Sequence, residues 1–175
     1  NKNIKNIVFI YRHSFYLKGE NSSKYSKEKL NPIKFIKNRE YISDVDKMKI
    51  YFEGYSKIIQ ELLSNNKNVY LIYPIPEIKT PIDKYIFNNF LFKKERISLE
   101  GPTLEYYNFR NNFVLDFNNE IVHENLLKIC VKDLFSNGTR TEVIRDGKAL
   151  YFDDNHVNLH GANIITNKII ELYDE

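Results

Sequence analysis

The chain has 175 residues, which is enough for one domain with a sizeable buried core. Its composition, 42% hydrophobic and 28% charged, is that of a folded globular protein and excludes a disordered one. The net charge is only +3 and the lysines are interspersed with acidic residues, so no basic stripe favours nucleic acid as a partner. No apolar run approaches the ~18 residues of a membrane span, and the run after the charged start is too short for a signal peptide. The lone Cys130 cannot form an internal disulfide.

Three short apolar runs predict strands that are buried on both faces, as in a parallel sheet covered by helices. The runs are "NIVFIY", "NVYLIYPIP" and "LLKICVKD", and they place strands near residues 6–11, 68–74 and 127–132. Prolines end the second strand, and Cys130 is expected to be a buried residue of the third.

Apolar residues at three- and four-residue spacing predict helices between these strands. A helix over 43–65 should begin at Ser43, which has an aspartate three residues later in a capping-box pattern. A second helix over 80–92 has Thr80 and Pro81 as suitable N-cap and N1 residues.

Two further helices are predicted over 102–121 and 158–173, the last with Asn158 as its N-cap. An Asp-Gly pair at 146–147 between apolar segments predicts a hairpin or tight loop. The polar stretch 17–42 is expected to be a long excursion with little regular structure. The alternation of strands and helices predicts an α/β fold with a parallel sheet in a three-layer α/β/α arrangement.

A cluster of acidic and imidazole side chains, "FDDNH", lies directly before the last predicted helix. Loops of this kind, at the carboxyl ends of strands, carry the reactive groups of open α/β sheets. The Asp-x-x-His spacing lets Asp153 orient the ring of His156, which would then act as a general base. Asp154 has the same chemistry, but its side chain should point elsewhere. By spacing alone the signal is weak, and a solvated loop followed by the helix cap Asn158 is the favoured reading.

A metal site is a second reading of the same segment, because His156 and His160 are four residues apart as in helical zinc pairs. It requires both rings on one helical face, and an N-cap at Asn158 places His156 before the helix. No cysteine cluster or further histidine lies nearby to complete the ligands, so no metal is expected. His13 and His123 are interpreted as surface or element-end residues without a role.

The segment "LYFDDNHVNLHGA" resembles the final block of the SGNH (GDSL-like) hydrolase fold, in the version found at the C-terminus of acyltransferase-3 membrane proteins. That block typically runs Leu-Tyr-x-Asp-x-x-His-Leu-Ser-x-x-Gly-Ala. Asp153 and His156 fall on its catalytic Asp and His, and Asn158 replaces the Ser while keeping the N-cap function. Gly161 and Ala162 would let the last helix approach the sheet closely. The resemblance implies a flavodoxin-like parallel sheet.

Three other stretches match the family in the same order, so the resemblance covers nearly the whole chain. "NIVFIYRHSFYLKG" is similar to a strand that ends in an Arg-Trp-x-x-Tyr type motif, with His13 at the Trp position. "VYLIYPIPEIKTPIDKYIF" is similar to the middle strand and its Pro-Glu segment, and "YYNFRN" resembles a later helix with Arg-Asn. The family often has two cysteines before the final block; here Ser136 stands near the first and the second is absent.

The nucleophile of this family is the serine of a Gly-Asp-Ser block, and no such block occurs in these residues. Ser14 follows a predicted strand, but no glycine precedes it to form a sharp, exposed turn. The resemblance therefore implies that residues 1–175 are a single SGNH-like domain that lacks its N-terminal strands, with the serine supplied from upstream. A degenerate domain is the alternative.

By resemblance, the function is acyl transfer, as an O-acetyltransferase or esterase, on a bacterial cell-envelope polysaccharide. The resemblance implies an extracytoplasmic location, a fused N-terminal membrane acyltransferase domain, a polysaccharide or acyl-ester substrate, and no cofactor. His156 would deprotonate the upstream serine with Asp153 as its partner. Arg12 would contribute to substrate binding or form a structural salt bridge. The rival interpretation is a non-catalytic α/β module that binds glycan or protein.

The absence of the family's first strands from these residues also predicts an unpaired edge on the sheet. The first two strands of such a sheet would flank the strand at 6–11, so without them its backbone has no partner along one edge. An unpaired edge tends to recruit another strand. Self-association through residues 6–11, or an edge covered by the 17–42 excursion, is therefore expected.

Overall fold

The structure is a computed structural model that describes residues 3–19, 36–37, 40–41, 43–91 and 99–174. Its centre is a parallel three-stranded sheet in the order β1-β4-β5. The strands are β1 (Asn6–Ile10), β4 (Asn68–Ile72) and β5 (Leu126–Ile129), paired with Asn6 opposite Asn68 and Val69 opposite Leu126.

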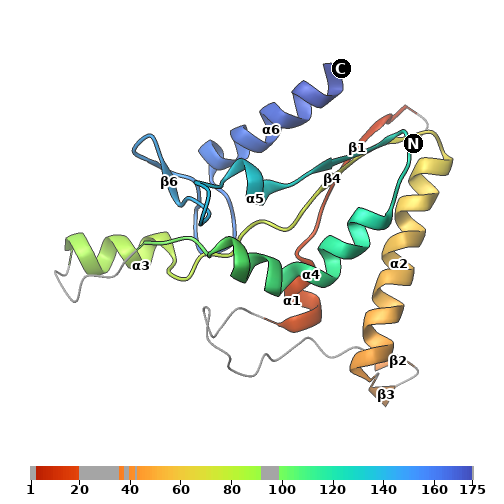
Figure 1. Ribbon diagram of the computed structural model, residues 1–175, viewed down its shortest axis with the longest axis horizontal. Coiled ribbons are helices and arrows are strands. Elements are labelled where there is room, and N and C mark those ends of the chain that lie inside the picture. Colours follow the sequence, from red (N-terminus) through yellow and green to blue (C-terminus); the bar gives the residue numbers. More distant parts are fainter. Residues whose placement is uncertain (1–2, 20–35, 38–39, 42, 92–98, 175) are drawn as a thin grey trace.

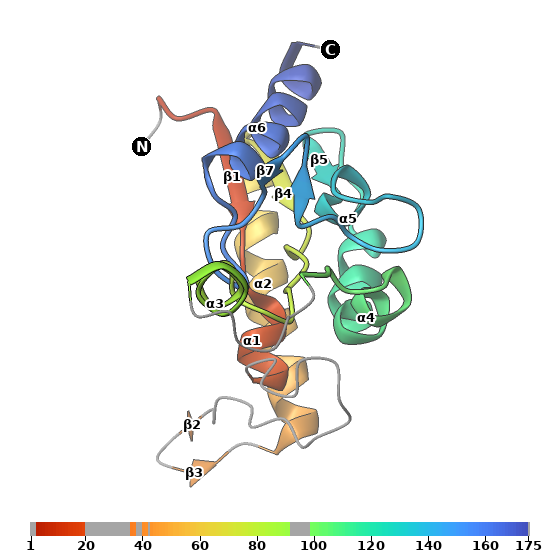
Figure 2. The same cartoon turned by 90° about the vertical axis from the view of Figure 1, so that its left-hand side faces the viewer.

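Helices cover both faces of this sheet, as predicted (Figures 1 and 2). The long helices α2 and α4 pack on one face and α6 packs on the other. The helical elements are α1 (His13–Lys18), α2 (Asp44–Ser64), α3 (Ile82–Ile86), the π-helical turn η1 (Phe87–Leu91), α4 (Leu104–Glu120), α5 (Val131–Leu134) and α6 (Leu159–Asp174).

The helix caps explain where the long helices begin. The Ser43 hydroxyl accepts a hydrogen bond from the backbone N–H of Asp46 at 3.1 Å, which confirms the predicted start of α2. Thr103 caps α4 in the same way, accepting from the backbone N–H of Tyr106. Each cap satisfies a backbone donor that the first helical turn leaves without a partner.

Three predictions about where elements begin or end were wrong. The third strand ends at Ile129, because the carbonyl of Cys130 accepts hydrogen bonds from the amides of Asp133 and Leu134 and so begins α5. Cys130 is accordingly a half-buried N-cap residue and not a strand residue, and burial raises the pKa of its thiol to about 11. The N-cap of α3 is Pro81 and not Thr80.

The predicted hairpin is present as β6 (Ile144–Arg145) and β7 (Lys148–Ala149), which pair antiparallel. Its two turn residues, Asp146 and Gly147, both have positive φ angles of 52° and 72°. This backbone is typical of a type I′ turn, which the Asp-Gly sequence favours.

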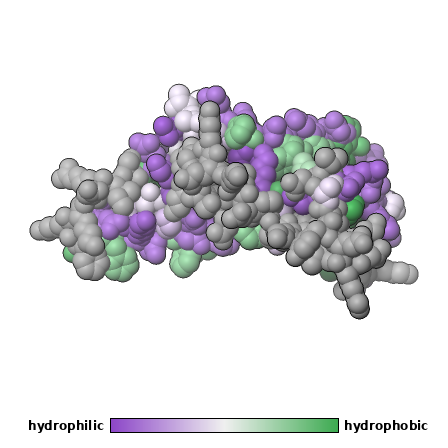
Figure 3. Space-filling model, turned by 90° about the horizontal axis from the view of Figure 1, so that it is seen from below, coloured by the Kyte–Doolittle hydropathy of each residue, from purple (hydrophilic) through white to green (hydrophobic). Residues whose placement is uncertain are grey.

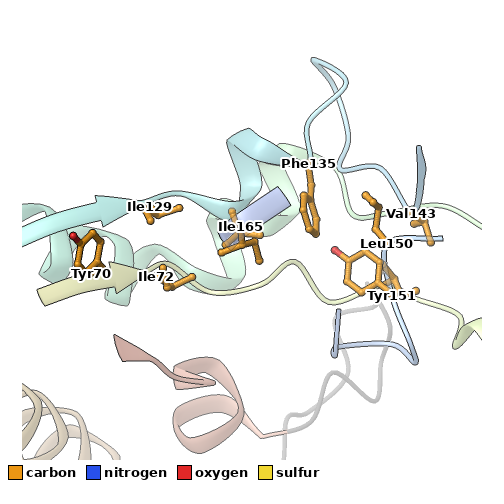
Figure 4. Close-up of a cluster of buried hydrophobic side chains, with 10 residues drawn as sticks. Tyr70, Ile72, Ile129, Phe135, Val143, Leu150, Tyr151 and Ile165 are labelled. Atoms are coloured by element: carbon orange, nitrogen blue, oxygen red, sulfur yellow. The ribbon is translucent and has the colours of Figure 1, made fainter. Parts of the chain in front are cut away.

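The hydrophobic core is divided between the two faces of the sheet. On the α6 face, side chains from β4, β5, α5, α6 and the hairpin region form one cluster, drawn in Figure 4. On the other face, residues of α2 such as Ile59 pack with Val69 and Leu71 of β4. Gly161 allows α6 to approach closely, although to the segment after β7 and not to the central sheet: a Cβ there would overlap the carbonyl oxygen of Leu150.

The strand β1 lies at the edge of the sheet and, among the described residues, pairs only with β4. Val8 and Ile10 are each about half exposed on it. Of the 17–42 excursion, residues 20–35, 38–39 and 42 lie outside the described residues. Its described strands, β2 (Ile36–Lys37) and β3 (Glu40–Tyr41), pair with each other and not with β1.

The described helices include none that combines the length and apolar character needed to cross a membrane. On the face shown in Figure 3, hydrophobic side chains appear as separate patches among hydrophilic ones.

Candidate active site

The segments that follow β1 and β4 meet the loop before α6 around a cavity of about 230 Å³. This position, beyond the carboxyl ends of parallel strands, is where open α/β sheets bind ligands. The cavity has apolar walls and a few polar groups; it is lined by Ile10, Tyr11, Arg12, His13, Ser14, Pro74, Ile75, Glu77, Asn111, Asn155 and His156. Such a composition is typical of small-molecule sites.

The predicted contact between Asp153 and His156 is present at this cavity. The Nδ1 atom of His156 lies 2.7 Å from the Oδ2 atom of Asp153. The other carboxylate oxygen, Oδ1, accepts hydrogen bonds from the backbone amides of Asn155 and His156 at 2.8 and 2.7 Å. The His156 side chain is 72% exposed, so its far edge is open to a ligand.

The surroundings of Asp153 keep its carboxyl group ionised. Partial burial alone would raise the pKa of Asp153, but hydrogen bonds from the Asn155 amide and from the ring and amide of His156 outweigh it and lower the pKa below its usual value. An ionised carboxylate at Nδ1 favours the tautomer in which Nδ1 carries the proton and Nε2 has a free lone pair. That is the form a general base needs.

Asp154 points away from the histidine, as expected. Its Oδ1 atom accepts a hydrogen bond from the side-chain amide of Asn155 at 2.7 Å. Asn158 caps α6, because its Oδ1 accepts from the backbone N–H groups of His160 and Gly161. His156 consequently lies before the helix, and His160 lies in its first turn. Within the described ranges, no three His, Cys, Asp or Glu side chains are grouped so that they could hold a metal ion.

Arg12 lines the cavity and also forms an ion pair. Its guanidinium contacts the Oε1 atom of Glu77 through Nε and Nη2, both at 3.1 Å. The other oxygen of Glu77 accepts from Nε of the buried Arg110 at 2.7 Å. Nearby, the Lys18 ammonium donates to the Arg110 carbonyl, and burial together with Arg110 lowers the pKa of Lys18 to about 8. The Glu77 carboxylate thus pairs with two guanidinium groups, and the Lys18 ammonium binds the backbone of one of them.

Ser14 is not placed as an exposed nucleophile. It is 4% exposed and its hydroxyl donates to the Oδ1 atom of Asn111. Asn111 is itself buried and donates to the Tyr107 carbonyl at 2.9 Å. The hydroxyl therefore joins α1 to α4 at the floor of the cavity.

His13 was interpreted as a surface or element-end residue. It does lie at the end of an element, but it is not at the surface. His13 begins α1 but is fully buried, with Nδ1 2.7 Å from the Tyr51 hydroxyl. His123 is exposed, and its Nδ1 accepts from the backbone amide of Asn125. The burial of His13 follows from aromatic neighbours on α2, which are far from it in the sequence.

Sequence reasoning assigned no role to Glu77, Arg110 or Asn111. The available signal was that each stands in a stretch that carries the family resemblance: Glu77 in the Pro-Glu segment, and Arg110 and Asn111 in "YYNFRN". The structure brings these stretches together with Arg12 from the strand motif.

The fold and the site define an α/β domain with an Asp–His pair at the carboxyl edge of a parallel sheet. The chain belongs to the family described as "SGNH domain (fused to AT3 domains)", which it matches over residues 1–171. Among curated proteins no match was found.

The fold is similar to a solved structure, the lipopolysaccharide acetyltransferase periplasmic domain of Salmonella ser. Paratyphi A. The TM-score is 0.50 and the sequence identity is 16%, with 74% of this chain and 51% of that chain covered. At this identity the likeness concerns the fold. The chain spans about half the length of that solved chain.

Proposed function

We propose that this domain takes part in acyl transfer by Ser-His-Asp chemistry, as an O-acetyltransferase or esterase. The observation that carries the proposal is the 2.7 Å contact between Asp153 and His156 at the rim of a cavity. The chain's family supports it, since that family is described by its fusion to AT3 domains. In this proposal Asp153 and His156 are catalytic, and no metal or cofactor takes part.

The proposed mechanism needs a serine from a segment that precedes residue 1 in a longer protein. His156 Nε2 removes the serine proton while the oxygen attacks the acyl carbonyl, and Asp153 supports the imidazolium that forms. The leaving group departs with the proton from His156, which leaves an acyl-enzyme. A sugar hydroxyl or water then loses its proton to His156 and takes the acyl group, and His156 returns the proton to the departing serine oxygen.

The proposed substrate is an acyl ester whose acyl group passes to a bacterial cell-envelope polysaccharide, on the extracytoplasmic side, with a membrane acyltransferase domain fused to this one. The support is the AT3 fusion of the family and the periplasmic acetyltransferase domain with a similar fold. Arg12 is proposed to bind substrate; its side chain is 35% exposed even while it pairs with Glu77.

Labelling with a fluorophosphonate tests the source of the serine. We expect the isolated 175 residues to show no labelling and no measurable hydrolysis of p-nitrophenyl acetate, because Ser14 is buried and donates to Asn111. A longer protein that includes the preceding segment should be labelled at a serine before residue 1. Peptide mapping by mass spectrometry identifies the labelled position.

Two results would contradict this assignment. Hydrolysis by the isolated chain that disappears in the Ser14→Ala variant would make Ser14 the nucleophile. Absence of any labelled serine in the longer protein would instead favour the rival function, a non-catalytic module that binds glycan or protein.

The open edge of β1 leads to a second proposal, that the isolated chain self-associates through residues 6–11. The carbonyl of Lys5 accepts from Asn68 of β4, so the alternation of a parallel ladder turns the backbone groups of Val8 toward the open side. Val8 is also half exposed, which makes the edge apolar.

Light scattering checks this proposal. The isolated chain should form dimers or larger species, and Val8→Lys should return it to a monomer because a charged side chain disfavours edge pairing. Ile58→Lys, at a residue of similar exposure on α2, is the matched control and should leave the mass unchanged. A monomeric parent chain would contradict the proposal.

A further inference from the structure

Glu77 joins three segments of the chain that are distant in sequence. Its Oε1 atom accepts from Arg12, which follows β1, and its Oε2 atom accepts from Arg110 of α4 at 2.7 Å. Arg110 also donates from Nη2 to the carbonyl of Gly19 at 2.9 Å, after α1. The Glu77 and Arg110 side chains are only 10% and 4% exposed, so protein groups rather than water compensate their charges.

The residue after Glu77 contacts the catalytic loop directly. The backbone N–H of Ile78 donates to the carbonyl of Asp154 at 2.7 Å. Ile78 is 2% exposed and packs in the same core cluster as Leu150 and Tyr151, the residues that lead into that loop. Asp154 stands next to Asp153, so the position of the Asp153 carboxylate is linked to the peptide group between Glu77 and Ile78.

We infer that Glu77 is a positioning residue for His156: its ion pairs with Arg12 and Arg110 fix the segment whose Ile78 amide holds the 153–156 loop at the cavity. The catalytic use of this arrangement depends on the proposed function, but the arrangement itself does not. Ion pairs that are shielded from water hold their geometry more firmly than exposed ones. The network therefore sets where the imidazole of His156 lies relative to the cavity.

The inference makes a specific prediction for Glu77→Gln, which keeps the shape of the side chain and removes its charge. The Ile78 amide should exchange with solvent at least about 10-fold faster, because its segment is no longer held by the two guanidinium groups. The Asp153–His156 contact should loosen, so the fraction of the His156 ring that carries its proton on Nδ1 should fall. Hydrogen exchange measures the first effect, and imidazole nitrogen NMR shifts measure the second.

Two comparisons separate positioning from general destabilisation. The amide of Leu71 in the central strand reports on unfolding of the whole domain, and the exchange of Ile78 should increase by a larger factor than that of Leu71. Glu142→Gln is the matched control, because Glu142 pairs with Arg145 three residues along the chain, in the hairpin region. It should change neither the Ile78 exchange nor the His156 tautomer.

Glu77→Gln leaves Arg110 buried without its partner and for that reason could fail to fold. In that case Arg12→Met tests the inference with the same two measurements. Arg12 is the more exposed partner, and its loss removes one of the two ion pairs. A folded variant of either kind with unchanged Ile78 exchange and unchanged His156 tautomer would overturn the inference. Neither readout needs a serine or a substrate, so the result stands apart from whether the domain transfers acyl groups.

Discussion

Replacing His156 with alanine in the longer protein is expected to lower kcat for acyl transfer by about 10²–10⁴-fold, the usual contribution of a general base. The ring is the only basic group that the structure places at the cavity with a carboxylate at its other nitrogen, among the residues described. Initial rates with p-nitrophenyl acetate measure the loss. His123→Ala, at an exposed histidine away from this cavity, should retain the parent rate.

Asp153→Asn should reduce the rate nearly as much, although it changes only one atom. The amide oxygen can still accept from the backbone N–H groups of Asn155 and His156, as Oδ1 does now. The amide nitrogen then faces Nδ1 of His156 as a donor, which moves the ring proton to Nε2 and removes the free lone pair. Asp154→Asn should have little effect, because that side chain contacts Asn155. A rate within a few-fold of the parent for His156→Ala would contradict the catalytic assignment.

Local sequence signals predicted the elements of this fold well. The apolar runs predicted β1 and β4, and the hydroxyl at Ser43 predicted the start of α2, because each depends on residues within a few positions. The end of β5 was missed for the converse reason. "KICVKD" has an apolar composition that suits a strand, but hydrogen bonds to the Cys130 carbonyl turn the chain into α5. A β-branched run does not reveal such a turn.

The residues of the candidate site also differ in whether their contacts could be predicted from nearby sequence. Asp153 and His156 are three residues apart, so their contact could be read from the sequence. Glu77 lies 65 residues from Arg12 and 33 from Arg110, and no local pattern reports such a contact. Only the return of the chain through β1, β4 and α4 brings these charges together. The sequence therefore indicated the contact between Asp153 and His156, while the ion pairs of Glu77 could be found only from the fold.

The domain is expected to lose stability between neutral pH and pH 4 because of His13. The burial of this residue, like the contacts of Glu77, becomes visible only in the fold. His13 is fully buried, and burial lowers its pKa to about 4 from the ordinary value of 6.5. The rings around it belong to Tyr11, Tyr51 and Tyr55, which carry no charge at or below neutral pH. The folded state therefore has no nearby tyrosinate that would favour the imidazolium.

The direction of the effect follows from the lowered pKa. Above pH 6.5 the ring is neutral in both states, and the full contribution of His13 to stability is present. Below pH 6.5 the ring becomes protonated in the unfolded chain, whereas in the folded chain it stays neutral until the pH falls to about 4. The free energy of unfolding should fall over this window by about 3 kcal/mol, at 1.36 kcal/mol per pH unit.

Urea unfolding at pH 7, 5.5 and 4 measures this loss in the parent chain and in His13→Phe. Phenylalanine fills the buried aromatic site but cannot take a proton. The stability of the variant should therefore fall less between pH 7 and pH 4 than that of the parent chain, and the difference is the contribution of His13. The variant also loses the hydrogen bond to Tyr51, which lowers its stability by about 1 kcal/mol at every pH and leaves the slope unaffected. His123→Phe, at an exposed ring, should follow the parent curve. Parallel curves for the parent and His13→Phe would show that the buried ring takes up its proton as readily in the folded chain as in the unfolded one.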